Sequence, residues 1–257
     1  MRRTLALVAL ALTTVGAQAA QITLTGTIRD FKGANEAGGH PDFEYTIVDQ
    51  PGAVQSTLVG GKPALLPGAI NTGSFHTQAD FAQWYTDVPG VNQSKSHSIT
   101  LDDAGHPGIF TYTNNNFFPI DGELFGNTPG QGHNYHFTYE LHTTFGFQGG
   151  EVFTFSGDDD VWVFVNGKLA IDLGGVHSAK TATLTLDAPT AALYGLTAGN
   201  NYTLDFFFAE RHTTQSNFSI ATTLPLVSQP EVPEPTTYAL MGCSLAALGL
   251  IRRFKKA

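Results

Sequence analysis

The sequence predicts an all-β protein, an antiparallel β-sandwich of about ten strands connected by long loops. Three observations support this fold class. Short apolar or alternating segments of strand length recur along the chain, and many of its 28 glycines and 13 prolines fall between them. Only one segment has helical periodicity. No internal repeat of about 20 to 50 residues is present, which argues against a solenoid or a propeller.

The chain begins with the pattern of a secretory signal peptide, predicted over residues 1–19. Arg2 and Arg3 precede an apolar stretch at residues 5–15, and Ala17-Gln18-Ala19 forms a small-x-small cleavage site. The apolar stretch is shorter than the roughly 20 residues that a membrane span needs, so cleavage is favoured over a permanent anchor. Everything that follows is therefore expected to be exported.

The first part of the mature chain predicts one strand, long loops and a helix. Residues 21–27 alternate between apolar and polar side chains, as in a strand with one buried face. Residues 29–73 are rich in Gly and Pro and predict loops laid over a sheet edge. The helical segment lies within residues 75–88, where Thr77 or Asp80 would cap a helix whose aromatic side chains pack inward.

Two strands, at residues 98–101 and 108–113, are predicted around a turn that holds Asp102 and Asp103. This acidic pair lies in a simple hairpin loop, so we expect it to be solvated. Residues 114–122 mix amide side chains with aromatic rings. That chemistry suits a sugar ligand, and it suits a turn packed against the core equally well.

Residues 135–145 predict a strand whose two faces differ in polarity. Tyrosine, phenylalanine and leucine point to one side, while His136, Glu140 and His142 point to the other. Two histidines and a glutamate on one face are a zinc-ligand set in chemical terms. Because the two histidines would lie about 20 Å apart along a strand, we expect solvent rather than zinc on this face.

The middle of the sequence predicts a β-hairpin. Residues 161–165 form an uninterrupted apolar run, and the Asn166-Gly167 pair that follows is a strong signal for a two-residue turn. A strand without alternation is covered on both faces, so this run should lie centrally in a sheet that packs against a second layer. Three further strands are predicted at residues 181–186, 202–208 and 218–224.

Three consecutive carboxylates, Asp158, Asp159 and Asp160, stand immediately before this strand, at the rim of the sheet. Negative charges about 4 Å apart repel each other by roughly 1 kcal/mol per pair in water, and by more when desolvated. Three arrangements would offset this repulsion: solvation of the turn, ion pairs with Lys168 and Arg211, or a bound divalent cation. Carboxylate oxygens suit calcium, although the spacing is not that of an EF-hand. Pairing with Arg211, which also follows an apolar strand, is the main alternative to calcium.

A longer pattern around these aspartates resembles the fibro-slime domain, a branch of the PA14-like β-sandwiches. The resemblance covers about residues 26–224, and we therefore expect one such domain over residues 20–225. It rests on FTFSGDDDVWVFVNGKL at 153–169, DLGGVH at 172–177 and FAERH at 208–212, with further matches at 29–31, 40–43, 117–122 and 133–140.

The resemblance implies a calcium-dependent sugar site. In PA14-like lectin domains, two adjacent aspartates joined by a cis peptide bind calcium, and the calcium in turn binds sugar hydroxyls. Asp158 and Asp159 align with that pair. Asp160, our third candidate metal ligand, stands where a glycine is common, and Asn166 stands where an aspartate often precedes the turn glycine; both departures affect the shape of the sugar site. The candidate ligand-binding residues around it are Asp172, His177, Glu210 and Asn217.

The C-terminal segment predicts a sorting signal. Residues 226–235 form a linker that ends in Pro233-Glu234-Pro235, and residues 236–257 hold sixteen mostly apolar residues followed by a basic end. As a transmembrane helix the apolar part spans about 24 Å, and the basic end stays cytoplasmic. The arrangement resembles the PEP-CTERM signal of Gram-negative bacteria that make exopolysaccharide. The resemblance implies cleavage near the motif by an exosortase-type enzyme, with a transient tether in the inner membrane; a permanent anchor is the alternative.

The charge of the mature chain limits its partners. Loss of both terminal segments would remove six of the 13 basic residues and change the formal net charge from −9 to −15. So acidic a surface repels nucleic acid and anionic lipid. Cys243, the only cysteine, lies in the C-terminal segment. The exported domain would therefore have no internal disulfide and must rely on its core.

Together these features predict an exported cell-surface or matrix protein that binds carbohydrate, such as exopolysaccharide, through calcium. A structural matrix protein without a ligand is the alternative. The sequence contains no nucleophile elbow, zinc-protease helix or phosphate loop, so we predict that it is not an enzyme. A glycoside-active enzyme, the third hypothesis, would need two carboxyl groups about 5 to 10 Å apart. The candidates are Glu140, Glu210, Asp172 and the acidic run.

Overall fold

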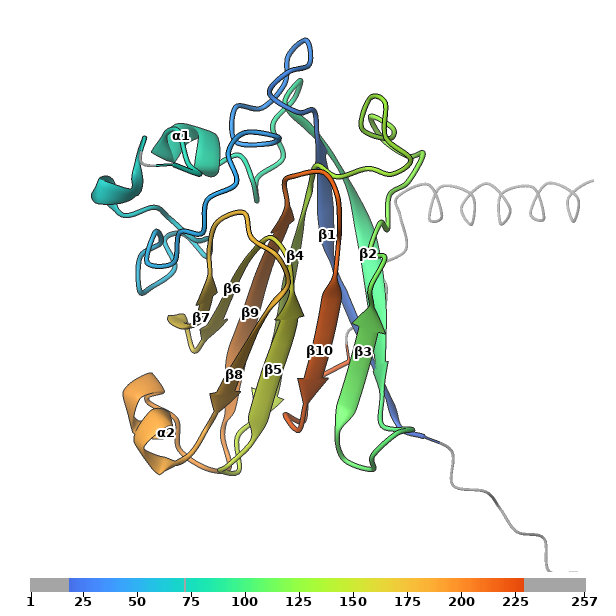
Figure 1. Cartoon of the computed structure of the whole chain (residues 1–257). Coiled ribbons are helices and arrows are strands. Elements are labelled where there is room, and N and C mark those ends of the chain that lie inside the picture. Colours follow the sequence, from blue (N-terminus) through green and yellow to red (C-terminus); the bar gives the residue numbers. More distant parts are fainter. Residues whose placement is uncertain (1–18, 72, 229–257) are drawn as a thin grey trace, which may run out of the picture.

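A computed structural model describes residues 19–71 and 73–228 of the chain, and it confirms the all-β antiparallel fold. The ten strands in this part form one continuous sheet in the order β7-β6-β9-β4-β1-β2-β3-β10-β5-β8. The sheet folds over on itself, so that β3, β10, β5 and β8 lie in front of β4, β9, β6 and β7 (Figure 1). The bounds are β1 Gln21–Phe31, β2 Asn92–Asp102, β3 Phe110–Asn114, β4 Phe137–Gly146, β5 Val152–Gly157, β6 Asp160–Val165, β7 Lys168–Leu173, β8 Lys180–Thr185, β9 Asn201–Glu210 and β10 Phe218–Thr222.

The helices of the described residues are short. A 3-10 turn, η1, spans Pro67–Ala69, and α1 spans Gln78–Phe81, where the amide of Asp80 donates to the Thr77 hydroxyl at 3.0 Å as predicted. A second α-helix, α2 at Ala188–Tyr194, was not predicted. At seven residues it is too short to show a helical period. Its capping residues, Asp187 before it and a left-handed Gly195 after it, were readable in the sequence.

Strand β6 is buried on both faces, as its uninterrupted apolar run predicts. Val161, Val163 and Val165 point into the core between the two layers. Trp162 and Phe164 point the other way, into a second core. The turn after β6 has left-handed φ values at Asn166 and Gly167, which fits the predicted two-residue hairpin.

The loops of the first third of the chain supply the cover for this second core. Phe43, Phe75 and Trp84 pack there, against β6 and β9. The expectation that residues 29–73 lie over a sheet edge holds in part. Ser56 and Thr57 pair with the edge strand β7, while the aromatic side chains of the segment also cover a sheet face. This cover explains why β6, which lies next to the edge strand β7, has no exposed face.

Strand β4 corrects a second expectation. His136 and Glu140, which were predicted to face solvent, are buried at 1% and 5% exposure. His142 remains partly exposed, with 45% of its side chain accessible. The reason is the same loop cover, which extends from β6 and β9 across the polar side of β4.

Several predictions concern segments outside the described residues. They are the signal peptide, the Pro233-Glu234-Pro235 motif and the C-terminal helix. Among residues 19–71 and 73–228, no helix has the length and apolar character that crossing a membrane requires.

Candidate functional site

The three aspartates lie where several strand ends meet at one rim of the sandwich. Strand β6 begins at Asp160, which is paired with Ala209 near the end of β9. On the other layer, Gly157 at the end of β5 is paired with Phe218 at the start of β10. The segment 211–217 between β9 and β10, here the β9–β10 loop, therefore passes directly over the aspartates.

Asp160 is fully buried and paired with Arg211. One carboxylate oxygen accepts from the Arg211 Nε at 2.5 Å, and the other accepts from the Gly175 amide at 2.5 Å. The same guanidinium donates to the backbone carbonyls of Asp42 and Ser74 and lies over the Trp84 ring. For Asp160, the structure thus has the arginine counter-charge that was the main alternative to calcium.

Asp158 and Asp159 are buried but are not paired with the guanidinium. Asp158 accepts from the backbone amide and the side-chain amide of Asn217, at 2.5 and 2.9 Å. Asp159 accepts from the backbone amides of His177 and Arg211, at 3.2 and 3.0 Å. The peptide bond between the two aspartates is cis, as the family resemblance implies.

A fourth acid, Glu210, is fully buried beside them. Within the described part of the chain, neither of its carboxylate oxygens has a hydrogen-bond partner. The nearby Ser216 hydroxyl donates instead to the Phe117 carbonyl at 2.7 Å. Burial, and then the charges of Asp159 and Asp158, raise the pKa of Glu210 well above its ordinary value. Burial also raises the pKa of Asp159 to about 7, against the opposing effect of Arg211.

These residues meet the chemical requirements of calcium in part. The donors are hard oxygens, and four carboxylates share one guanidinium, so the site has a surplus of negative charge. Yet in residues 19–71 and 73–228 no three His, Cys, Asp or Glu side chains converge on a common metal position. A calcium ion would accordingly be held by Asp158 and Asp159, whose oxygens accept only from amides, together with amide, backbone or water oxygens. Asp160 already has a cationic partner in Arg211.

The other predicted ligand-binding residues fall into two groups. Glu210, Asn217 and His177 lie at the rim with the aspartates, and the His177 ring contacts the carbonyls of Ser178 and Leu173. Asp172 is engaged elsewhere, because it accepts from the Trp162 indole and from the amides of two loop glycines. Lys168 does not contact the acids either; its amine donates to the carbonyl of Leu193 at 2.8 Å.

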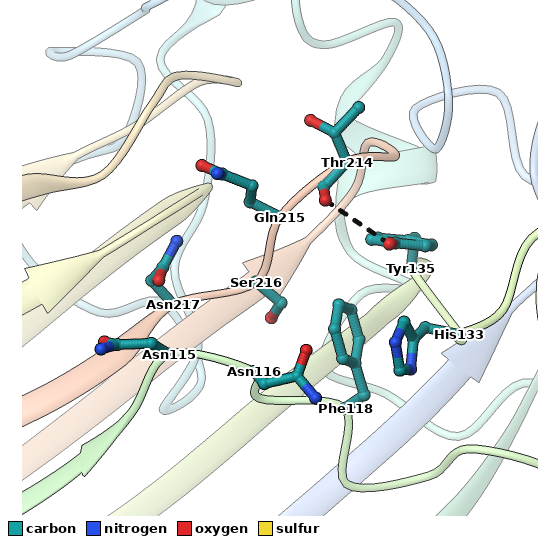
Figure 2. Close-up of a pocket in the computed structure, with 9 residues that line it drawn as sticks. All are labelled: Asn115, Asn116, Phe118, His133, Tyr135, Thr214, Gln215, Ser216 and Asn217. Carbon is teal, nitrogen blue, oxygen red and sulfur yellow. Dashed lines mark hydrogen bonds between the residues drawn. The ribbon is translucent and has the colours of Figure 1, made fainter.

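A pocket of about 230 Å³ opens beside the aspartates, and Asn217 forms part of its wall. Figure 2 shows the Phe118 and His133 rings side by side, and they are stacked with centroids 4.0 Å apart. The Tyr135 hydroxyl is directed at the carbonyl of Thr214, at 3.5 Å. The remaining lining groups are amides and hydroxyls from Asn115, Asn116, Gln215 and Ser216. The mixture of amides and rings predicted for residues 114–122 thus contributes to a pocket.

A second pocket, of about 170 Å³, lies on the other side of the β9–β10 loop. Asp158, His177 and Thr213 are among its lining residues. The loop therefore forms a wall of both pockets while its ends hold the aspartates.

Sequence reasoning missed the residue that fastens this loop. Glu44 comes from the long N-terminal loop segment and accepts from the amide and the hydroxyl of Thr213, at 3.1 and 2.8 Å. It also contacts His136 Nε2 at 3.0 Å. Although burial opposes it, these hydrogen bonds lower the pKa of Glu44 to about 2. No local pattern indicates this contact, because the partners are 92 and 169 positions away in the sequence.

Comparison with known proteins shows the family to which the chain belongs. The model of the PA14 domain matches residues 89–235, more than half of the chain. Protein psiC of Dictyostelium discoideum is 40% identical over 224 residues, covering 80% of this chain and 41% of the relative. Protein psiD of the same organism is 46% identical over 156 residues, covering 58% and 30%. The chain spans less than half the length of these curated relatives.

The similarity of the chain to solved structures is weaker. A PA14 sugar-binding domain from an RTX adhesin has a TM-score of 0.35 at 11% identity, covering 80% of this chain and 91% of that one. An epithelial adhesin A domain from Candida glabrata, in complex with beta-lactose, has a TM-score of 0.29 at 12% identity, covering 83% and 92%. With TM-scores this low, we draw no conclusion about the site from these structures.

Proposed function

Because the chain belongs to the PA14 domain family, we propose that its β-sandwich binds carbohydrate at the rim, in the pocket beside Asn217. The observation that carries the proposal is the composition of this pocket, where amides and hydroxyls surround the stacked rings of Phe118 and His133. The hydroxyls of a sugar would form hydrogen bonds with the amides and hydroxyls of the pocket, and its C–H faces would stack on the aromatic rings. The volume of about 230 Å³ lies just below the range of about 300 to 1,000 Å³ that is typical of small-molecule sites, so we expect it to hold a single sugar unit.

The proposal includes calcium, held by Asp158 and Asp159 with the oxygens of Asn217 and the loop backbone. Bound calcium would supply positive charge to a site where four buried carboxylates share one guanidinium, and it would offer coordination positions to sugar hydroxyls. Asn217 links the two parts, because it contacts Asp158 and also lines the pocket.

Calorimetric titration of the full-length protein with calcium tests the metal part. Wild type should release or absorb heat with one saturable site, and Asp158→Asn should abolish it. Asp103→Asn is the matched control, because it removes an aspartate from the acidic pair of the β2–β3 loop, away from the rim. A flat wild-type trace, or equal binding by Asp158→Asn, would remove calcium from the proposal.

A glycan array with and without a chelator tests the sugar part and identifies the glycan. Phe118→Ala should weaken binding about two- to tenfold, since an aromatic contact is worth about 0.5 to 1.5 kcal/mol. Tyr45→Ala is the control, because this half-exposed ring contacts His76 and lies outside the pocket. Glycan binding that is unaffected by Phe118→Ala would place the ligand elsewhere.

We further propose that the protein is exported to the surface or extracellular matrix of a Gram-negative bacterium. The signal-peptide pattern and the tail motif at Pro233-Glu234-Pro235 support this, with an exosortase-type enzyme as the processing partner. Mass spectrometry of the mature protein should find the last residues absent. Retention of the basic end at 252–257 would contradict processing and indicate a permanent anchor.

A structural matrix protein without a ligand is the second candidate, and one observation favours it. The Arg211 guanidinium already pairs with Asp160, which reduces the need for a cation. We propose no catalytic role, because Glu210 is fully buried, Glu140 is ion-paired and Asp172 holds loop amides. Turnover of a labelled polysaccharide that is lost in Glu210→Gln would contradict this.

A further inference from the structure

The outer face of the front layer carries an unusual set of side chains. We call it the hydroxyl face; it is formed by β3, β10, β5 and β8, which lie side by side in Figure 1. The strand register places Thr113, Ser219, Ser156 and Thr181 next to one another in a row across all four strands. The alternate residues of these strands, such as Phe155 and Ile220, point into the core.

A second row runs parallel to the first. It consists of Thr111, Ala221, Thr154 and Thr183, again in register across the four strands. Neither row contains an ionisable side chain. Asp102, which is paired with Thr111, is the first one reached beyond the β3 edge. In a protein with a formal net charge of −9, such a neutral face is not explained by solubility, for which surface charge is the usual means.

Cross-strand hydrogen bonds hold the hydroxyls in place. The side-chain oxygens of Thr113 and Ser219 lie 2.9 Å apart, and Thr181 donates to Ser156 at 2.9 Å. In the second row, the hydroxyls of Thr154 and Thr183 are 3.0 Å apart. Each pair uses one hydrogen and leaves one O–H and several lone pairs for a ligand. Fixed rotamers reduce the entropy that binding would otherwise cost.

The spacing of the sheet makes these hydroxyls a flat, regular grid. Neighbouring strands lie about 4.8 Å apart, and residues two apart in one strand lie about 6.8 Å apart. A shallow, largely apolar groove of about 270 Å³ adjoins the second row, lined by Ile109, Val152, Ala221 and the neighbouring threonines. The face therefore alternates hydroxyl and methyl groups.

We propose that the hydroxyl face docks onto the flat surface of an uncharged, insoluble polysaccharide. Such a surface repeats hydroxyls and C–H groups in two dimensions without charge, which matches the chemistry and the regularity of the two rows. Many weak contacts to fixed groups add up only when both surfaces are flat and rigid. The inference does not rest on the rim site, because it needs neither calcium nor the pocket beside Asn217.

Pull-down of the full-length protein on microcrystalline cellulose and on chitin tests the proposal. The double variant Thr154→Lys/Thr183→Lys, which places two charges in the second row, should lower the bound fraction at least about tenfold. Thr203→Lys is the matched control, since Thr203 is exposed on β9 in the other layer. The control and added chelator should leave binding unchanged. A result in which wild type binds neither polymer, or in which chelator abolishes binding, overturns the proposal.

A second variant guards against misfolding of the lysine variant. Thr154→Val/Thr183→Val keeps the β-branched shape and removes two hydroxyls, so it should retain the thermal unfolding midpoint and bind severalfold more weakly. Equal binding by this variant and wild type would contradict the role of the hydroxyls. The face could instead bind a second copy of the chain, and sedimentation velocity tests this alternative. If the wild type is a dimer and the lysine variant is a monomer, the face is a dimer interface and the proposal is overturned.

Discussion

Two clusters of buried acids in residues 19–71 and 73–228 are balanced differently. In the rim cluster, the carboxylates of Asp158, Asp159, Asp160 and Glu210 share one cation, the guanidinium of Arg211. Only Asp160 contacts that guanidinium. The remaining carboxylates either accept hydrogen bonds from amides or, in the case of Glu210, have no partner among the described residues.

The β4 cluster, made of Arg29, Lys62, Glu140, His142 and Asp205, has nearly equal numbers of acids and bases. Glu140 accepts from Arg29 at 2.7 Å and from His142 at 2.6 Å, and it also contacts the Lys62 amine. Although burial opposes it, hydrogen bonds from His142 and Lys62 and the charges of Lys62 and Arg29 lower the pKa of Glu140 to about 2.

The difference shows which cluster is electrostatically complete. In the β4 cluster every charge has an opposite partner, so the pKa of Glu140 falls and the ionised state is stable. At the rim, burial raises the pKa of Asp159 and of Glu210, which means that the site favours a proton or an added cation. A surplus of this kind is expected where a ligand, rather than the fold alone, completes the electrostatics.

Removal of the single rim cation should have the largest effect. Arg211→Met leaves Asp160 buried without its partner, so the free energy of unfolding should fall by about 3 to 5 kcal/mol. Arg29→Met is the comparison, because Glu140 keeps Lys62 and His142; we expect a loss of about half that size. Urea unfolding of both variants measures the difference, and equal losses would show that the two clusters are balanced alike.

Neutralising one acid in each cluster should separate them more sharply. Glu140→Gln removes the charge and one of the two acceptor oxygens that face three charged donors, and it should cost about 2 kcal/mol. Glu210→Gln removes a carboxyl group that has no hydrogen-bond partner and whose raised pKa shows that the fold disfavours its charge. At pH 7 the free energy of unfolding should therefore stay the same or rise. A large loss in Glu210→Gln would mean that Glu210 has a structural partner after all, in contrast to the geometry described here.

The β4 cluster should also show a pH dependence that its histidine sets. Although burial opposes it, hydrogen bonds to Asp205 and Glu140 raise the pKa of His142 from 6.5 to about 9. The histidine therefore stabilises the fold fully below pH 6.5, and this contribution is lost as the pH rises through 9. Because 45% of the side chain is exposed, solvent screening reduces the effect to about 1 kcal/mol. His142→Gln should flatten the alkaline part of a stability curve measured by urea unfolding from pH 6 to pH 10.

Much of the core was predictable, because it depends on local patterns. The apolar run at residues 161–165 and the Asn166-Gly167 turn give the β6–β7 hairpin directly, and the acidic run must then stand at its start. The contact between Asp160 and Arg211 was foreseen only as an alternative. It depends on β6 pairing with β9, and sequence patterns do not specify the order of strands.

Burial of the polar side of β4 was not predictable for a related reason. Alternation in a strand shows which residues share a face, but not whether loops from elsewhere cover that face. Here the cover comes from the long segment before β2, which brings Lys62 to Glu140 and Glu44 to His136. The same segment fastens the β9–β10 loop, so a region with little sequence pattern shapes the candidate site.

The smallest expected effect concerns Lys168, which sequence reasoning offered as a partner of the rim acids. Its amine lies on the far side of the hairpin turn and donates to the carbonyl of Leu193, at the exposed end of α2. Lys168→Met should therefore change the unfolding free energy by less than about 0.5 kcal/mol and leave calcium titration unaltered. A shift in calcium affinity would show that the charge of Lys168 acts on the rim cluster over a long distance. The rim acids would then experience more positive charge than the single guanidinium of Arg211 provides.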